Sequence, residues 1–373
     1  MGEGYHGPAA LTRNSFGAGL TDRGRSLYHA RMHAAIRPTV LLILFLCLGH
    51  GTALAIPDGK PANQGPRTLV VAGDGSGQFT SIQDAIDDAH DGDTVQVKAG
   101  EYREDVTIHS KERLKLIGAG ADRVKVLGRE RVGVFHIGKW PYGATEIEIS
   151  GLTIYEHGGH AMGIFNGRNI RLHHIRINGM VFGQQVQDVR IEQCDIGGSE
   201  TTGVQFADSQ ATLVGNYIHD NDHGVIIAGR SDVRLERNVI VRSLFEGVVV
   251  TDKARAILVS NTIVKNGGGA AFLGASSSVA SGNIVGLNKV GFLLGPSSLA
   301  TLSTNALYNS ESEYRRTEPA DGQAELKGES DIVGDPLFVD PQRDDFRLRP
   351  ETPLVRRGEF AYLGALPPMS ARP

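Results

Sequence analysis

The chain contains two cysteines, Cys47 and Cys194, and a single tryptophan, and aromatic residues make up only 6% of its 373 residues. Cys47 lies in an N-terminal segment that we expect to be removed, so the mature chain keeps one cysteine and forms no internal disulfide. This excludes the small secreted scaffolds that depend on disulfide bonds. Stability must therefore come from packing, and the few aromatic residues indicate a core filled by aliphatic side chains.

Long apolar runs are also absent, with the exception of residues 40–48, VLLILFLCL. This run is shorter than the roughly 20 residues that a membrane-spanning helix needs. Arg37 precedes it, and the sequence Ala-Leu-Ala at residues 53–55 follows it, which is typical of the cleavage site of a secretory signal peptide. We therefore assign residues 1–55 to a signal peptide region, with Met32 as an alternative start.

Cleavage after Ala55 would remove five arginines and two acidic residues, so the formal net charge would change from −4 to −7. An acidic protein is poorly suited to bind nucleic acid. We expect a secreted or periplasmic monomer with no nucleic-acid partner and no stable membrane span after cleavage. An uncleaved membrane anchor is the alternative.

What the sequence has instead is a repeat of 22 or 23 residues along its second half. One marker is an asparagine, and the other is a glycine followed by an apolar residue. The asparagines are Asn216, Asn238, Asn261, Asn283 and Asn305, and the glycines are Gly203, Gly224, Gly247, Gly269 and Gly291. A fixed period of this length predicts a solenoid in which each period is one turn.

Each turn consists of short β-strands. The residues between the markers are rich in Val, Ile and Gly, and they show no helical periodicity. In residues 222–243, for example, Val225 and Ile227 alternate with Ile226, so one strand directs Val225 and Ile227 inward. Stacked turns pair such strands in parallel and in register. The sequence therefore predicts an all-β chain folded as a parallel β-helix.

The recurring asparagines predict a ladder of side-chain amides along the solenoid axis. Asn tolerates left-handed backbone and bonds neighbouring backbone groups, so it suits a bend between two strands. Amides at the same place in successive turns can also bond one another. Cys194 occupies this place one turn earlier, and Ile175 one turn before that. We expect the five asparagines to form one column that stabilises the fold.

Both ends of the solenoid carry segments that can cover it. Residues 79–90, FTSIQDAIDDAH, predict an amphipathic capping helix that begins at Thr80 or Ser81. Its apolar face consists of Ile82, Ala85, Ile86 and Ala89. From residue 311 the period is lost. We assign residues 56–67 to a linker, 68–310 to the β-helix and 311–373 to a tail packed on the last turns.

Two segments resemble a known superfamily. Residues 73–104, GDGSGQFTSIQDAIDDAHDGDTVQVKAGEYRE, resemble the opening of pectinesterases, including a Gly-x-Tyr-x-Glu element at Gly100, Tyr102 and Glu104. Residues 335–338, DPLF, resemble the ending of many secreted bacterial β-helix proteins. The resemblance implies the right-handed parallel β-helix of the pectin-lyase-like superfamily.

The pectinesterase chemistry is not implied. That family carries a Gln-Asp-Thr-Leu element and a Leu-Gly-Arg-Pro-Trp element. Here Gln187 and Asp188 are followed by Val-Arg, and the only tryptophan, Trp140, lies in Gly-Lys-Trp-Pro. The clustered Asp and Gly-His elements of polygalacturonases are absent too. Pectate lyases have looser patterns, namely acidic Ca²⁺ ligands and an Arg or Lys base, and these are compatible with the sequence.

In this superfamily the ligand groove resembles a trough along one sheet, which we place on the strands after the repeated glycine. Its expected outward residues, turn by turn, are Phe165, Gln185, Gln205, Ile226, Val249, Ala271 and Leu293. The early positions are polar, and we expect Gln185 and Gln205, with Arg168 nearby, to bind substrate. The late positions are apolar, and the 311–373 tail is expected to cover them.

One charged cluster follows these strands. Because parallel strands lie about 4.8 Å apart, Asp188 and Asp208 are expected to share Ca²⁺. Arg230 or Lys253 would then remove a proton next to a uronate carboxylate, which is the first step of β-elimination. The alternative is that these are solvated pairs of turn charges, which contribute little.

A second cluster precedes the strands. His223 and Glu246, on adjacent turns, could form an acid/base pair. His219 and His223, four residues apart, could instead bind a transition metal, although no further Cys or His completes the ligand set at recognisable spacing. The third interpretation is an ordinary polar turn.

The sequence thus favours a β-helix protein that acts on an acidic polysaccharide such as pectin or alginate, in the sharpest version as a Ca²⁺-dependent lyase. The alternatives are a non-catalytic carbohydrate-binding or envelope scaffold, and a periplasmic maturation protein that handles a metal or another protein. The fold does not decide among these.

Overall fold

The computed structural model describes residues 65–129, 133–139, 141–318 and 327–369. The chain divides into two units, residues 1–60 and 61–373, and all described residues belong to the second. The predicted signal peptide region therefore lies outside the described residues, as does most of the predicted linker. Among the described residues, no helix is long and apolar enough to cross a membrane.

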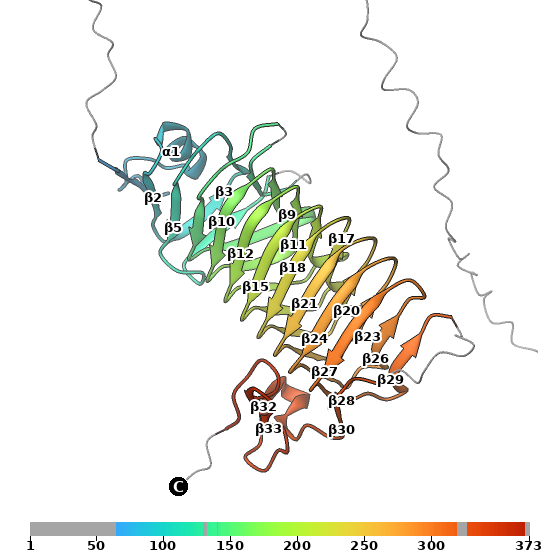
Figure 1. Cartoon of the computed structure of the whole chain (residues 1–373). Helices are drawn as coiled ribbons and strands as arrows, with labels where there is room; N and C mark the ends of the chain where they lie inside the picture. Colours follow the sequence, from blue (N-terminus) through green and yellow to red (C-terminus); the bar gives the residue numbers. More distant parts are fainter. Residues whose placement is uncertain (1–64, 130–132, 140, 319–326, 370–373) are drawn as a thin grey trace, which may run out of the picture. The chain divides into compact units, whose positions relative to one another are not determined.

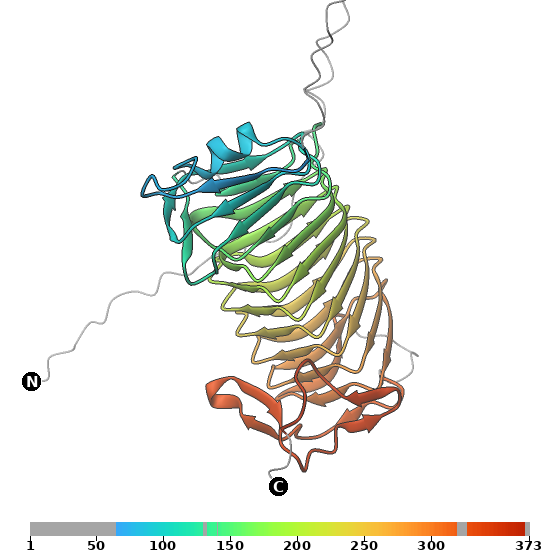
Figure 2. The ribbon, with the colours of Figure 1, turned by 90° about the vertical axis from the view of Figure 1, so that its left-hand side faces the viewer.

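The second unit is a right-handed parallel β-helix, which confirms the predicted fold class. Three strands per turn form three parallel sheets, and the turns stack regularly along the axis (Figures 1 and 2). We call them the groove sheet, the second sheet and the third sheet, in the order in which each turn visits them. The second sheet alone has 11 strands.

The groove sheet contains β4 Val106–Ile108, β7 Phe135–Ile137, β14 Thr202–Ala207, β17 His223–Ala228, β20 Glu246–Val250, β23 Gly268–Phe272, β26 Val290–Leu294 and β29 Ser312–Arg316. The second sheet contains β1 Thr68–Val71, β2 Thr94–Val97, β5 Lys115–Gly118, β8 Glu148–Ser150, β10 Arg168–His173, β12 Gln187–Glu192, β15 Gln210–Val214, β18 Asp232–Glu236, β21 Arg255–Val259, β24 Ser277–Ser281 and β27 Leu299–Ser303.

The third sheet contains β3 Gly100–Arg103, β6 Val124–Leu127, β13 Asp195–Gly197, β16 Tyr217–His219, β19 Val239–Val241, β22 Thr262–Val264, β25 Ile284–Gly286, β28 Ala306–Tyr308 and β30 Ile332–Val333. Two longer strands, β9 Thr153–Phe165 and β11 Arg176–Gln184, run from the third sheet into the groove sheet. Inward side chains from all three sheets form one continuous core, which is mainly aliphatic but also buries Phe135, Phe206, Phe272 and Phe292.

The predicted asparagine ladder forms at the bend between the second and third sheets. The Oδ1 atom of each asparagine accepts from the backbone N–H and the Nδ2 of the asparagine one turn earlier, at 2.8–3.1 Å from Asn216 through Asn305. At the early end, the N–H of Cys194 donates to Asn216. At the late end, Asp331 accepts from Asn305. All five asparagines are buried.

A second ladder, which sequence analysis missed, lies at the bend that leads into the groove sheet. Asn266, Asn288 and Asn309 bond in the same way from turn to turn. The glycine marker is explained first by the next turn, because a Cβ on any of the five marker glycines would lie 2.4–3.1 Å from a backbone carbonyl oxygen of that turn. At two of them the ladder amides are also close. The Nδ2 of Asn266 lies 2.9 Å from where a Cβ on Gly247 would be, and that of Asn309 lies 2.8 Å from the corresponding point on Gly291. A side chain on these glycines would displace the ladder.

This second ladder is interrupted at Ser243, which stands between Asn221 and Asn266. The Asn221 Nδ2 and the Ser243 Oγ are buried and have no hydrogen-bond partner among the described residues. We expect Ser243→Asn to raise the free energy of unfolding by about 1 kcal/mol, because the new amide accepts from Asn221. Chemical denaturation measures this. Ser243→Ala is the control, since it adds no bond; equal midpoints for the two variants would contradict the explanation.

A short helix, α1 Ile82–Asp88, covers the first turn as predicted (Figure 2). Ser81 is its N-cap and accepts from the Asp84 N–H. The buried Glu104 carboxylate also accepts from the Ser81 hydroxyl and from the Ile82 and Gln83 N–H groups. An anion at a helix N-terminus is favourable. The Gly-x-Tyr-x-Glu element therefore holds the cap in place, and its role here is structural.

The C-terminal tail packs on the last turns, as predicted, but on a different face. Its hairpin of β31 Phe338–Asp340 and β32 Asp345–Leu348, joined by the short helix η1 Pro341–Arg343, packs with β33 Val355–Arg357 and β34 Phe360–Tyr362 below the third sheet (Figure 1). The shared apolar cluster joins Val241, Val264 and Ile284 of that sheet to Phe346 and Leu363. The tail therefore covers the third sheet and not, as sequence analysis expected, the apolar half of the groove.

Candidate functional site

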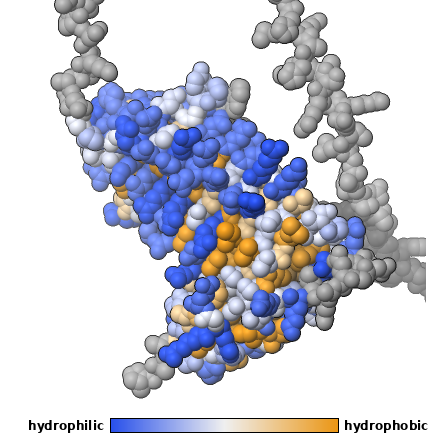
Figure 3. Space-filling view, in the orientation of Figure 1, coloured by the Kyte–Doolittle hydropathy of each residue, from blue (hydrophilic) through white to orange (hydrophobic). Residues whose placement is uncertain are grey.

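On each strand of the groove sheet, one residue lies between two inward, buried residues. These residues pair from strand to strand and form a column along the sheet. From the first turn to the last it consists of Thr107, His136, Gly163, Phe182, Gln205, Ile226, Val249, Ala271, Leu293 and Arg315. The first half is polar and aromatic, and the second half is apolar until Arg315. The visible surface follows the same trend, since it is hydrophilic over the early turns and more apolar over the later ones (Figure 3).

Two of the predicted column residues lie elsewhere. Phe165 pairs with Gln184, two positions beyond the column residues Gly163 and Phe182. Gln185 directly follows β11, in the bend that leads to β12, and has a left-handed backbone. The reason is that Gly163 and Gly183 are not equivalent to the later marker glycines. Gly163 itself lies in the column, and Gly183 pairs with the inward Phe206, whereas Gly203 is level with Met180. Gln205 does lie in the column as expected, and Arg168 begins β10 on the second sheet, where it is exposed.

An aromatic row lies over the first half of the column. The ring of Phe165 leans over Gly163, because a Cβ on that glycine would lie 2.6 Å from the ring. Phe165 lies between His136, with ring centroids 6.3 Å apart, and Phe182, at 5.9 Å. His160 lies 5.3 Å from Phe182 on the other side. Aromatic faces of this kind suit the apolar face of a sugar ring.

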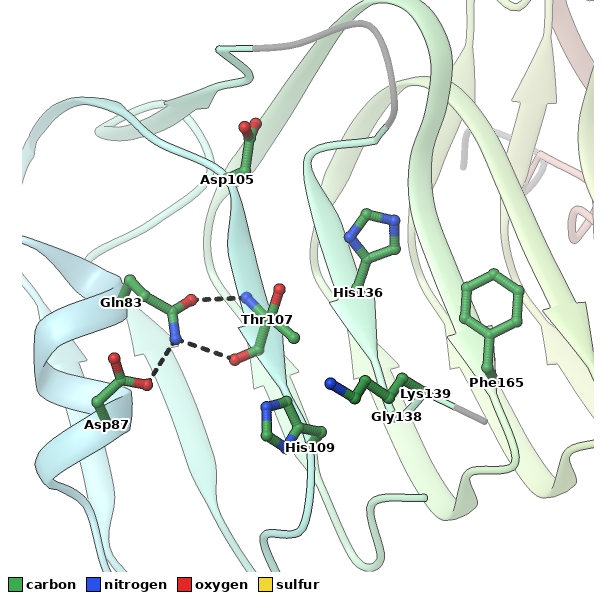
Figure 4. Close-up of a pocket in the computed structure, with 9 residues that line it drawn as sticks. All are labelled: Gln83, Asp87, Asp105, Thr107, His109, His136, Gly138, Lys139 and Phe165. Carbon is green, nitrogen blue, oxygen red and sulfur yellow. Dashed lines mark hydrogen bonds between the residues drawn. The ribbon is translucent and has the colours of Figure 1, made fainter. Parts of the chain in front are cut away.

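The row borders a cavity of about 670 Å³ between α1 and the first turns of the groove sheet (Figure 4). The cavity is lined by Gln83, Asp87, Asp105, Thr107, His109, His136, Gly138, Lys139 and Phe165. Gln83 is held by Asp87 and by the backbone of Thr107, so the α1 side of the wall is fixed. The side chains that Figure 4 draws without a hydrogen bond include the imidazoles of His109 and His136, the Lys139 ammonium and the Asp105 carboxylate, and Asp105 accepts from the Arg129 N–H.

Electrostatics distinguish the histidine next to this cavity. Burial lowers the pKa of His160, and the nearby His136 lowers it further. The His160 imidazole is therefore neutral at neutral pH and keeps a lone pair that can accept a proton. Sequence analysis missed this region because its turns vary in length and carry neither marker. The only available signal was the density of His109, His136 and Lys139 in a short stretch.

The predicted calcium ligands lie in neighbouring columns. Asp188 is the second residue of β12. The next residue, Val189, pairs with Ala211, so Asp188 is level with Gln210 and not with Asp208. Asp208 lies before β15, and its Oδ1 accepts from the Arg230 N–H at 2.9 Å. Sequence analysis treated the two as equivalent because both follow a strand by similar spacing. Calcium binding by this pair stays a prediction, but the register does not stack the two carboxylates.

The predicted bases are exposed on the same edge. Arg230 and Lys253 extend from the turns between the groove sheet and the second sheet, and their backbone N–H groups bond Asp208 and Gly229. Within the described part of the chain, no group of three or more His, Cys, Asp or Glu side chains gathers as a metal site. Calcium binding by Asp188 and Asp208 stays a prediction, and the reaction proposed for this protein contains no calcium step.

The predicted acid/base pair does come together. His223 Nδ1 lies 3.4 Å from Glu246 Oε2 on the adjacent turn, and Phe245 stacks on the His223 ring at 5.1 Å. The contact with His223 lowers the pKa of Glu246. His219, by contrast, directs its two ring nitrogens to Asp195 and Asp220, both at 2.7 Å. The alternative of a metal bound by His219 and His223 therefore has no support in the geometry.

Comparison with known families agrees with this fold. The family described as "Right handed beta helix region" matches residues 140–307, and the family described as "Pectinesterase" matches residues 68–149. These matches and the observed architecture agree with the predicted resemblance to the pectin-lyase-like superfamily of right-handed β-helices. The pectinesterase match ends at residue 149 and covers the capping helix, its Glu104 contact and most of the residues that line the cavity.

Similar solved structures share the architecture at low identity. Pectate lyase Pel9A is 11% identical, with 82% of this chain and 97% of that chain covered and a TM-score of 0.46. The A-module of the Azotobacter vinelandii mannuronan C-5 epimerase AlgE6 is 14% identical, with coverages of 68% and 93% and a TM-score of 0.42. PfbA, a surface adhesin of Streptococcus pneumoniae, is 14% identical, with coverages of 61% and 80% and a TM-score of 0.45. No curated protein sequence matches the chain.

Proposed function

We propose that the protein binds an acidic polysaccharide along the polar and aromatic half of the groove column and cleaves it by β-elimination. The observation that supports this proposal is the cavity of about 670 Å³ at the early end of the column. Its size is typical of ligand sites. The Lys139 ammonium, the imidazoles of His109 and His136 and the Phe165 face line this space together with the carboxylates of Asp87 and Asp105. The cationic and basic groups on the β4 and β7 side are complementary to an acidic sugar ring.

The residues of the cavity can be assigned to the steps of this reaction. Phe165 supports the sugar ring, and Lys139 pairs with the carboxylate of a uronate, which makes the neighbouring C5 proton more acidic. His136 removes that proton. The electron pair forms the C4–C5 double bond while the C4–O bond breaks, and His109 or water protonates the leaving oxygen. Charge and atoms balance without a further co-reactant.

The pair of His223 and Glu246 is a second candidate centre, further along the same groove. It also has an exposed aromatic neighbour, Phe245, which is 50% exposed. Because the Glu246 carboxylate is ionised, the pair could accept a proton as a base. It could not supply both the proton acceptor and the proton donor of the reaction. Substitutions in the two regions separate them, as described in the Discussion.

The proposal needs an exported protein, because extended polysaccharides lie outside the cytoplasm. The predicted cleavage after residue 55 makes Ile56 the first mature residue. N-terminal sequencing of the protein from culture medium or periplasm checks this. Recovery of the chain in the membrane fraction with residues 40–48 retained would favour the anchored alternative.

The reaction is tested by a screen of polygalacturonate, polymannuronate and mixed alginate, with Ca²⁺ and with a chelator. We expect ultraviolet absorbance from unsaturated uronate ends on at least one polymer, and we expect it to persist in the chelator. Loss of turnover in the chelator would revive the Asp188 and Asp208 hypothesis. Binding without turnover would identify a non-catalytic binding protein, and neither binding nor turnover would reject the proposal.

A further inference from the structure

His219 lies outside the groove, at the end of β16 on the outward side of the third sheet. Its Nε2 lies 2.7 Å from Asp195 Oδ1 on the preceding turn, and its Nδ1 lies 2.7 Å from Asp220 Oδ2. The ring leans over Gly197 of β13, where a Cβ would lie 2.6 Å from the imidazole. Because Gly197 has no side chain, the ring has room to lie between the two carboxylates.

This geometry requires a charged ring. An ionised carboxylate only accepts hydrogen bonds, so both ring nitrogens must donate, and only the imidazolium carries a proton on each. Burial by itself would lower the pKa of His219, but the hydrogen bonds to Asp195 and Asp220 outweigh it and raise the pKa above its usual value. The bond with His219 lowers the pKa of Asp195. The Arg242 guanidinium, and after it His219, lowers the pKa of Asp220 to about 2.

The contacts of Asp220 continue into the C-terminal tail. Arg242, one turn later, donates its Nε and Nη2 to Asp220, each at 2.7 Å. Its Nη1 donates to the carboxylate of Asp344, which directly follows η1 in the tail hairpin. Lys265 donates to the same carboxylate at 2.9 Å. Asp220 therefore orients the arginine that holds the hairpin on the third sheet.

A second contact links His219 to the tail. The Tyr217 ring lies against the imidazole with centroids 4.6 Å apart, and the Tyr217 oxygen accepts from Arg242 Nη1 at 3.2 Å. Tyr217 also packs against the apolar cluster that the third sheet shares with the tail. On the other side, Arg176 pairs with Asp195 at 3.3 Å. The titratable and charged groups around His219 in the described part of the chain are therefore Asp195, Arg176, Tyr217, Asp220 and Arg242.

We propose that protonation of His219 controls how firmly the tail hairpin docks on the third sheet. When the ring loses one proton, one nitrogen presents a lone pair to a carboxylate, so the ring no longer bridges Asp195 and Asp220. Asp220 then loses its fixed orientation, and Arg242 loses the support that directs it to Asp344. This device lies outside the groove and does not depend on the proposed function.

Docking of the tail should weaken as the pH rises. The folded chain raises the pKa of His219 above that of an unfolded histidine, which is about 6.5. The bridge therefore contributes its full stability below this ordinary value and loses it as the pH rises through the folded-state pKa. Both carboxyls stay ionised over that range, because their pKa values are lowered.

The test is amide hydrogen exchange of the full chain at several pH values between about 6 and about 9, on either side of the ordinary histidine pKa. Rates are corrected for the intrinsic effect of pH on exchange. We expect protection of residues 338–348 to fall several-fold with rising pH, relative to the core strand β18. Nuclear magnetic resonance of the histidine ring protons should show that His219 titrates above the exposed His90.

Three variants separate the charge of His219 from its volume. His219→Gln should leave the hairpin weakly protected at every pH, because a neutral amide does not balance two carboxylates. His219→Arg is a permanent cation with several donors and should keep the hairpin protected across the range. His90→Gln, at a side chain that is 74% exposed, should keep the wild-type profile. Thermal melting shows whether each variant is folded.

The outcome also depends on the link to the tail. Asp344→Asn should lower protection of the hairpin at low pH, because it weakens the contact through which Arg242 acts. The proposal is overturned if folded His219→Gln shows the same pH profile as the wild type. It is equally overturned if His219 titrates below His90.

Discussion

Replacing Asn261 by leucine should lower the free energy of unfolding by about 3 kcal/mol or more, because one buried side chain satisfies groups on three turns. Asn261 Oδ1 accepts from the N–H and Nδ2 of Asn238, and its Nδ2 donates to Leu235 O and Asn283 Oδ1. Leucine has a similar size but neither donor nor acceptor. Each group left buried without a partner costs about 1–3 kcal/mol.

The measurement is chemical denaturation of the purified chain, with Ile257→Thr as the matched control. Ile257 lies four residues earlier in the same turn and is 37% exposed on the outward face of the second sheet. A change there should stay within about 0.5 kcal/mol. If Asn261→Leu unfolds at the same midpoint as the wild type, the ladder does not carry the stability that its hydrogen bonds suggest.

The regular half of the fold is predictable from sequence because each turn repeats the same local requirements. The asparagine marker identifies the bend between the second and third sheets, and Cys194 takes the same place at the end of the ladder. The glycine marker was recognised without its cause. Only the structure shows that a Cβ on these glycines would meet a backbone carbonyl of the next turn and, at Gly247 and Gly291, also the Asn266 and Asn309 amides. A second asparagine series was visible in the sequence, but Ser243 interrupts it.

The candidate site was predicted less well, because it depends on register and not on spacing. Gln185 was counted from Gly183, but that glycine pairs with the inward Phe206, so the column residue of this turn is Phe182. Asp188 and Asp208 looked equivalent when counted from a glycine, yet they lie in neighbouring columns. His223 and Glu246 were placed correctly because both lie in turns where the period is strict.

The position of the tail could not be derived from composition alone. Sequence analysis expected the 311–373 tail to cover the apolar half of the groove, where Ile226, Val249 and Leu293 lie. The third sheet offers a comparable apolar surface, and there the tail also gains ion pairs, since Asp344 bonds both Arg242 and Lys265. The apolar groove half is thus not covered by the described residues of the tail hairpins.

The largest effect on function is expected from the cavity. His136→Ala should lower turnover of the polymer found in the screen by about 10²–10⁴-fold, the usual contribution of a positioned proton acceptor. Binding should change little, because the Phe165 face and the Lys139 charge remain. Phe165→Ala should have the opposite pattern and weaken binding more than it slows the bound substrate, since the ring supports the sugar before and during the reaction.

The competing centres supply the matched controls for this prediction. His223→Ala removes an imidazole of similar exposure from the same groove, and Lys253→Ala removes an exposed cation from its edge. If the cavity performs the chemistry, both variants should keep turnover within about threefold of the wild type, because neither touches the reacting sugar. If His223→Ala abolishes turnover while His136→Ala is silent, the reaction occurs at the His223 and Glu246 pair instead. The polymer then extends over the later turns, and the early cavity serves only to bind its end.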